Sequence, residues 1–116
     1  MQIKQRVVDY YKTPTGKEPA KEWLSSVKDM LTKAILYKRS RQAGLGQFGK
    51  TRTVGDGVWE LKIDYGPGYR VYYGIHGDKL ILILMAGSKR TQTADIKKAR
   101  AYWIEWKEIN TLKPNK

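Results

Sequence analysis

Three short segments in the middle of the chain, rich in β-branched and aromatic residues, constrain the fold most strongly. They cover residues 57–64, 69–75 and 80–86, and they are separated by tight turns at 66–68 (Gly-Pro-Gly) and 76–78 (His-Gly-Asp). β-Branched and aromatic residues favour strands, whereas glycine and proline favour tight turns. We therefore predict an antiparallel meander of three strands.

The third of these segments is apolar at every position. Its sequence, Leu-Ile-Leu-Ile-Leu-Met-Ala over residues 80–86, is typical of a strand that is buried on both faces. Residues 3–11 are also β-branched and aromatic. We expect this first strand to pair beside residues 80–86, which would make the apolar segment a central strand of the sheet.

Helical patterns flank the meander. Apolar residues recur at steps of three and four from Ala20 to Ile35, after Pro19, which suits a first helical turn. We favour two helices here, with a break near residues 28–29, over one long helix. A last helix is expected from about Thr93. The order predicts an α+β fold in one domain over residues 1–116, with the helices packed on one face of the sheet.

Composition limits the classes of site and partner. The formal net charge is +12, which favours polyanions as partners. The chain has no cysteine and one histidine, which excludes disulfides, zinc–thiolate sites and multi-histidine metal sites. The N-terminus lacks the apolar core of a signal peptide, and the longest apolar run is too short to span a bilayer. We expect a soluble, cytoplasmic protein without a membrane partner.

Alternation along the strands gathers polar side chains on one face of the sheet. Residues 58–64 and 69–75 each direct their apolar side chains to one face, and we expect the helices to cover it. The opposite face, together with the turn after the third strand, collects cations, a carboxylate and a phenol: Glu60, Lys62, Arg70, Tyr72, Lys89 and Arg90.

Such a cluster suits the cleavage of RNA through its 2′-hydroxyl. Lysine and arginine stabilise negative charge that develops on phosphorus, and the arginine fork matches two phosphate oxygens. The proton acceptor stays open between Glu60 and Lys62, and Glu60 alternatively orients Arg70 or Lys62 by an ion pair. The alternative to a functional role for Arg70 is a surface salt bridge with Glu60 or Asp64. His76 lies in a hairpin turn, and we do not expect it to be catalytic.

Three stretches carry a resemblance to a known family. They are GDGVWELKI (55–63), GPGYRVYY (66–73) and LILMAGSKRTQTADI (82–96). The chain resembles the phage-derived killer-protein branch of the RelE/ParE/HigB toxin superfamily. The resemblance implies a RelE-like fold: a curved antiparallel sheet of about four strands, with two N-terminal helices and a C-terminal helix. It also implies an endoribonuclease without metal or cofactor, which cuts mRNA in the ribosomal decoding site.

The family's functional positions map onto the polar cluster. Arg70 matches the family arginine of the middle strand, Lys62 a basic position on the preceding strand, and Arg90 or Lys89 the basic residue after the last strand. Glu60 stands where RelE has lysine, and the histidines of some HigB members are missing, so the proton-transfer roles stay open. We expect catalytic roles for Lys62, Arg70, Lys89, Arg90 and Glu60, and RNA contacts from Tyr72, Lys50 and Arg52.

The resemblance also implies partners and leaves alternatives. The expected partners are mRNA, the ribosome and a helix-turn-helix antitoxin that covers the cationic face or the exposed part of the C-terminal helix. Since the superfamily shares its fold, a ParE-like poison of DNA gyrase is a second hypothesis. A non-enzymatic relic that only binds RNA or the antitoxin is a third.

Overall fold

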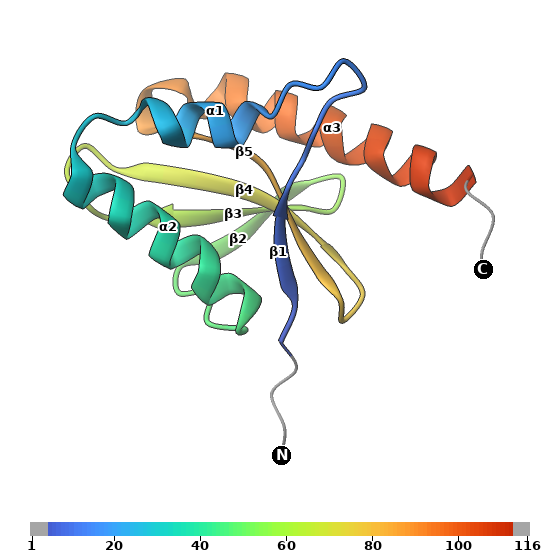
Figure 1. The fold of residues 1–116 in the computed structure, drawn as a ribbon, viewed down its shortest axis with the longest axis horizontal. Coiled ribbons are helices and arrows are strands. Elements are labelled where there is room, and N and C mark those ends of the chain that lie inside the picture. The colour runs from blue at the N-terminus through green and yellow to red at the C-terminus, as the bar shows by residue number, and fades with distance from the viewer. Residues whose placement is uncertain (1–4, 113–116) are drawn as a thin grey trace.

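The computed structural model describes residues 5–112, which form a five-stranded sheet with helices on both faces (Figure 1). The predicted α+β class is confirmed, and residues 3 and 4 of the expected first strand lie outside the described range. The elements are β1 (Val7–Tyr10), α1 (Pro19–Ser26), α2 (Met30–Gly44), β2 (Thr51–Gly55), β3 (Val58–Ile63), β4 (Tyr69–His76), β5 (Leu80–Ser88), a 3₁₀ turn (Lys89–Thr91) and α3 (Gln92–Leu112).

The meander lies at the centre of the sheet, whose strand order is β1-β5-β4-β3-β2. β3, β4 and β5 pair antiparallel, as predicted. β1 lies beside β5, as expected, but the two strands run parallel. No tight turn links β1 to β5, so local sequence did not fix its direction.

β2 is an additional edge strand that the sequence did not predict. It pairs antiparallel with β3 and joins it through a tight turn, in which Asp56 and Gly57 both have positive φ angles. β2 brings Thr51 and Arg52 beside β3. The sheet therefore has five strands rather than about four, and the extra strand forms one wall of the site described below.

The predicted break between the first two helices is confirmed. Asp29 caps α2, because its carboxylate accepts hydrogen bonds from the backbone N–H of Thr32 at 2.9 Å and from the Thr32 hydroxyl at 2.7 Å. These bonds satisfy a donor that the first helical turn leaves unpaired. None of the helices between residues 5 and 112 combines the length and the apolar character needed to cross a membrane.

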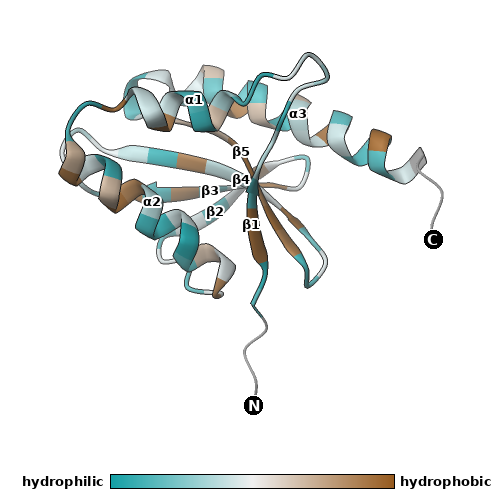
Figure 2. Ribbon diagram, viewed as in Figure 1, coloured by the Kyte–Doolittle hydropathy of each residue, from teal (hydrophilic) through white to brown (hydrophobic). Residues whose placement is uncertain are grey.

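The helices cover both faces of the sheet, which corrects the expectation that they pack on one face. α1 and α2 pack on the first face through Leu24 and Leu36, against a cluster that includes Val71 and Ile83. α3 packs on the second face, where its buried apolar residues are Ala99 and Trp103. β5 supplies apolar side chains to both faces, which is why Figure 2 shows it brown over much of its length.

Trp103 explains how α3 approaches the sheet so closely. Its ring lies over Gly74 of β4, where an added Cβ would come within 2.5 Å of ring atoms. The ring also stacks on Trp106, with centroids 5.2 Å apart. The second face therefore has its own packed layer, and the polar residues on it lie where this layer ends.

Candidate functional site

A cationic cleft opens where β2, β3 and β4 meet the start of α3. Its first part is a hollow of about 290 Å³ lined by Lys50, Thr51, Arg52, Glu60, Lys62, Arg70 and Gln92. An adjoining hollow shares Lys62 and Arg70 and continues along the β3–β4 turn (residues 64–68) to Lys89. Because the two hollows share these residues, we treat them as one cleft.

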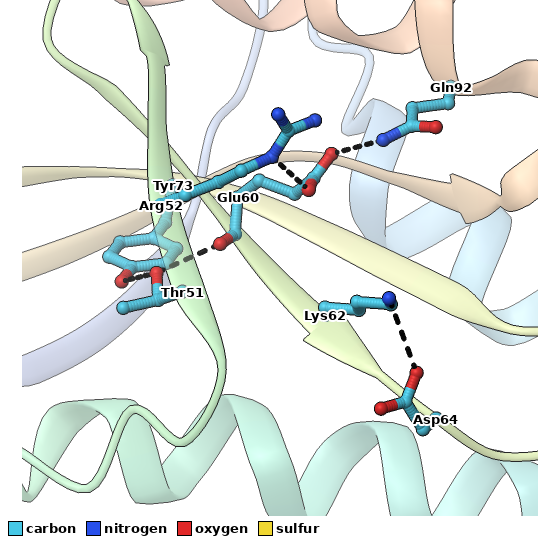
Figure 3. A network of polar contacts seen from close by, with 7 residues as sticks. All are labelled: Thr51, Arg52, Glu60, Lys62, Asp64, Tyr73 and Gln92. Carbon is cyan, nitrogen blue, oxygen red and sulfur yellow. Dashed lines mark hydrogen bonds and ion pairs between the residues drawn. The ribbon is translucent and has the colours of Figure 1, made fainter.

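Glu60 is the buried anion of the cationic cleft. The residue is only 2% exposed, and its carboxylate accepts hydrogen bonds from Arg52 Nε at 2.9 Å and from Gln92 Nε2 at 2.7 Å (Figure 3). Burial alone would raise the pKa of Glu60, but these two bonds and the charges of Arg52 and Arg70 outweigh burial and lower it. Glu60 is therefore held ionised, with each oxygen engaged.

Arg70 is the buried cation of the cleft. It is 6% exposed, and among the described residues its Nε has no hydrogen-bond partner. No ion pair joins it to Glu60 or Asp64, so the alternative of a simple surface salt bridge does not hold. Gly68 leaves room beside its guanidinium, since a Cβ there would lie 3.2 Å from Nη1. A buried donor without a partner is costly, and a ligand oxygen would satisfy it.

Lys62 and Lys50 share Asp64 at the rim of the cleft. Lys62 Nζ lies 3.8 Å from Asp64 Oδ1, and Lys50 Nζ donates a hydrogen bond to Asp64 Oδ2 (Figure 3 shows the first pair). The hydrogen bond from Lys50 is the main cause of a lowered pKa at Asp64. These groups are exposed to solvent, so the pairs hold the lysines only loosely.

The 3₁₀ turn after β5 brings Lys89 to the far end of the cleft. The backbone N–H of Lys89 donates to the carbonyl of Gly68 at 3.2 Å, which ties this turn to the β3–β4 turn. Lys89 lines the cleft, whereas Arg90 is exposed and is not among the lining residues. Of the two positions that the sequence left open, the structure brings Lys89 to Lys62 and Arg70.

Tyr72 lies on the same face as Arg70, as alternation predicted, but its ring is completely buried. It packs in the cluster beneath α3 with Leu84 and Ala99. A ring without exposed surface cannot stack on a base, so the expectation that Tyr72 contacts RNA is corrected. The physical reason is that α3 covers this part of the face that we expected to be free.

Sequence reasoning missed Gln92 and Thr51. Gln92 is the first residue of α3, and Thr51 begins β2, where its hydroxyl donates to the carbonyl of Glu60 at 2.8 Å (Figure 3). A glutamine that follows a basic turn carries no sequence signal of its own. Its role depends on where α3 docks, and the docking is a tertiary feature.

The cleft combines exposed cations with one buried guanidinium. Lys62 and Lys89 are partly or largely exposed, whereas Arg70 is held on a central strand. This set can bind a phosphate group and stabilise negative charge that grows on it. Both carboxyl groups of the cleft have lowered pKa values, which makes them weak bases near neutral pH.

Comparison with known proteins places the chain in a family. Residues 22–102 match the family described as Phage derived protein Gp49-like. An uncharacterised protein of Haemophilus influenzae (strain Rd) is 42% identical over 78 residues, an alignment that covers 67% of this chain and 79% of the relative. The chain therefore belongs to the Gp49-like family of phage-derived proteins, a toxin-like family related to RelE and HigB.

Proposed function

We propose that this protein is the toxin of a type II toxin–antitoxin system, and that it inhibits translation as a ribosome-dependent mRNA endoribonuclease. The observation that carries the proposal is Arg70, a buried arginine whose Nε has no partner among the described residues and which lines a cleft together with further cations. Membership of a family related to RelE and HigB supports it. The protein would act in the cytoplasm, where its substrate is translated.

In the proposed reaction, the 2′-hydroxyl of a ribose attacks the adjacent phosphorus and loses its proton. The 5′-oxygen of the next nucleotide leaves and gains a proton, which gives a 2′,3′-cyclic phosphate and a 5′-hydroxyl end. Arg70 would bind the non-bridging oxygens, where charge grows in the transition state, with Lys62 and Lys89 on either side. These side chains supply the positive charge that a metal ion supplies in other nucleases.

In this scheme Glu60 holds Arg52 and Gln92 in place and does not act as the base. Both of its oxygens already accept hydrogen bonds, and its pKa is lowered, so it is poorly suited to remove a proton. Of the two proton acceptors that the sequence left open, Glu60 is therefore set aside, and this scheme uses Lys62, which lies 3.8 Å from Asp64, as a cation. Lys50 and Arg52 line the same hollow and would contact the phosphates of neighbouring nucleotides.

The test is to induce the protein in bacteria and to map the 5′ ends of cellular RNA. We expect growth arrest with new 5′-hydroxyl ends inside translated frames, and we expect Arg70→Ala to lose both. Arg100→Ala is the matched control, because Arg100 pairs with Asp56 outside the cleft at 2.9 Å. Arrest with intact mRNA and gyrase-dependent DNA breaks would replace this proposal with a gyrase poison. Absence of arrest would leave a non-enzymatic binding protein.

We further propose a helix-turn-helix antitoxin as the partner that silences the protein. Two surfaces suit it: the cationic cleft, and the exposed part of α3, where Ile104 and Ile109 are 41% and 43% exposed. Co-expression should give a complex that survives purification. If the complex forms, replacing Ile104 and Ile109 by lysine distinguishes the surfaces, since only antitoxin bound along α3 would be released.

A further inference from the structure

The buried carboxylate of Glu60 is held from two sides by different elements. Arg52 reaches it from the edge strand β2, and Gln92 reaches it from the first residue of α3 (Figure 3). Glu60 itself lies on β3. The direction of this carboxylate therefore depends on the docking of both β2 and α3.

Arg70 is a further donor that could bind the Glu60 carboxylate in place of Arg52 or Gln92. In the pairing of β3 with β4, Glu60 lies opposite Tyr72, so Arg70 occupies the diagonal position two residues along β4. Long side chains can meet across such a diagonal. Arginine and carboxylate groups usually form paired hydrogen bonds when they are buried together. Here both residues line the same hollow, yet Glu60 bonds Arg52 and Gln92, and Arg70 Nε stays unpartnered among the described residues.

We infer that Gln92 is a positioning residue that holds Glu60 away from Arg70 and so keeps the Arg70 guanidinium open to a phosphate group. The inference rests on the proposed function only for the identity of that phosphate as part of RNA. Gln92 suits this task because its amide donates a hydrogen bond without adding charge to the cleft. Without that donor, one oxygen of Glu60 loses its partner. The buried donors without a partner among the described residues are Arg70 Nε and the Tyr72 hydroxyl, and Arg70 is the one whose positive charge attracts the carboxylate.

The test is a double-mutant cycle of Gln92→Ala and Glu60→Gln, with inorganic phosphate as the probe. The signal is the ¹⁵N–¹H resonance of Arg70 Nε, assigned by its loss in Arg70→Lys. Phosphate should shift this resonance in the unmodified protein. Gln92→Ala should weaken phosphate binding by about tenfold, the size expected when a charged hydrogen bond competes with the ligand. Gln47→Ala, at an exposed glutamine outside the cleft, should bind phosphate as the unmodified protein does.

The cycle separates positioning from a general structural role. When residue 60 is glutamine, no carboxylate remains to capture Arg70, so adding Gln92→Ala should then have no effect on phosphate affinity. An equal loss with glutamate and with glutamine at position 60 would overturn the inference, because it would mean that Gln92 only supports the local structure. Unchanged affinity in Gln92→Ala, or no response of Arg70 Nε to phosphate in the unmodified protein, would overturn it as well.

RNA cleavage by the same variants distinguishes failure of this inference from failure of the proposed function. If both hold, cleavage follows the phosphate affinities: Gln92→Ala is slowed when residue 60 is glutamate and is not slowed further when it is glutamine. If the phosphate cycle behaves as expected but no variant cleaves RNA on ribosomes, the positioning role of Gln92 stands and the nuclease proposal falls.

Discussion

The two faces of the sheet differ in what they bury. Beneath α1 and α2 the buried cluster is apolar, and the buried hydroxyls of Thr32, Ser40 and Tyr73 there are hydrogen-bonded. On the second face, Glu60 and Arg70 of the sheet and Asp95 of α3 are buried as well as apolar residues. The difference indicates that the two faces have different roles. The first face stabilises the fold, whereas the second face holds charged groups in fixed positions, and their burial lowers stability.

α3 also has an apolar packing part and a polar part, which follow one another along its length. Trp103 packs on Gly74 near its middle, whereas its first turn carries Gln92 and the buried Asp95. The Asp95 carboxylate accepts a hydrogen bond from the Thr91 hydroxyl at 2.6 Å. The aromatic part docks the helix, and the docked helix then places Gln92 against Glu60.

The largest expected effect is a loss of protein stability when a core residue beneath α1 and α2 is replaced. Leu36 of α2 is completely buried, and Leu36→Ala should lower the free energy of unfolding by about 2–5 kcal/mol through lost burial and the cavity left behind. Denaturant titration measures this loss. The RNA cleavage rate per folded molecule should stay within a few-fold of the unmodified protein. A folded Leu36→Ala variant without cleavage would show that the two faces are not independent.

A smaller loss is expected where α3 docks. Gly74→Ala places a Cβ within 2.5 Å of the Trp103 ring, so the ring must shift, and overpacking of this kind costs about 1–3 kcal/mol. Thermal unfolding together with tryptophan near-ultraviolet circular dichroism would detect both the loss and the shifted ring. This variant should also slow cleavage, because it displaces the helix that carries Gln92. Unchanged cleavage with a displaced ring would contradict the link between docking and site geometry.

The buried carboxyl groups should give stability a characteristic pH dependence. The pKa of Glu60 is lowered in the folded state, so its contribution is present above the unfolded value of about 4.3 and is lost as pH falls through the folded value. The difference in unfolding free energy between the unmodified protein and Glu60→Gln should therefore shrink on acidification. A difference that does not change across this range would mean that Glu60 is not held ionised by its partners.

The contribution of Asp95 to stability should change with pH in the opposite direction to that of Glu60. Burial is the main cause of its raised pKa, so its ionised form opposes folding, and this penalty is relieved as pH falls. Asp95→Asn should consequently gain stability relative to the unmodified protein as pH rises through the range in which the Asp95 carboxyl group ionises. Denaturant titrations at several pH values measure both slopes, and equal signs for Glu60 and Asp95 would contradict the assignment.

The smallest effect is expected at Tyr72. Its buried hydroxyl has no hydrogen-bond partner among the described residues, so Tyr72→Phe should be neutral or stabilising by up to about 1 kcal/mol. Cleavage should be unaffected, because the ring is buried and contacts no solvent. A marked loss of cleavage in a stable Tyr72→Phe protein would mean that the Tyr72 hydroxyl takes part in RNA cleavage after all.

The features predicted correctly were those that depend on local pattern. The meander and the position of β1 followed from strand-forming segments, tight turns and a strand apolar on both faces. The break near residues 28–29 was also expected, although the cap by Asp29 was not. Alternation also brought Glu60, Lys62 and Arg70 to one hollow. The direction of β1 and the covering of the second face depend on long-range packing, and the roles of Tyr72 and Gln92 changed with them. β2 pairs locally with β3 and was missed because its sequence, Thr-Arg-Thr-Val-Gly, carries little apolar pattern.

The central claim is that the second face carries the chemistry through Arg70, and its most direct test is single-turnover cleavage of mRNA on programmed ribosomes. Arg70→Ala should slow cleavage by about 10²–10³-fold, the effect of removing one preorganised donor from a developing charge. Its free energy of unfolding should change little, since the removal of a buried, unpartnered Nε is offset by the loss of the favourable charge interaction between Arg70 and Glu60. Cleavage at the unmodified rate by folded Arg70→Ala would contradict the account.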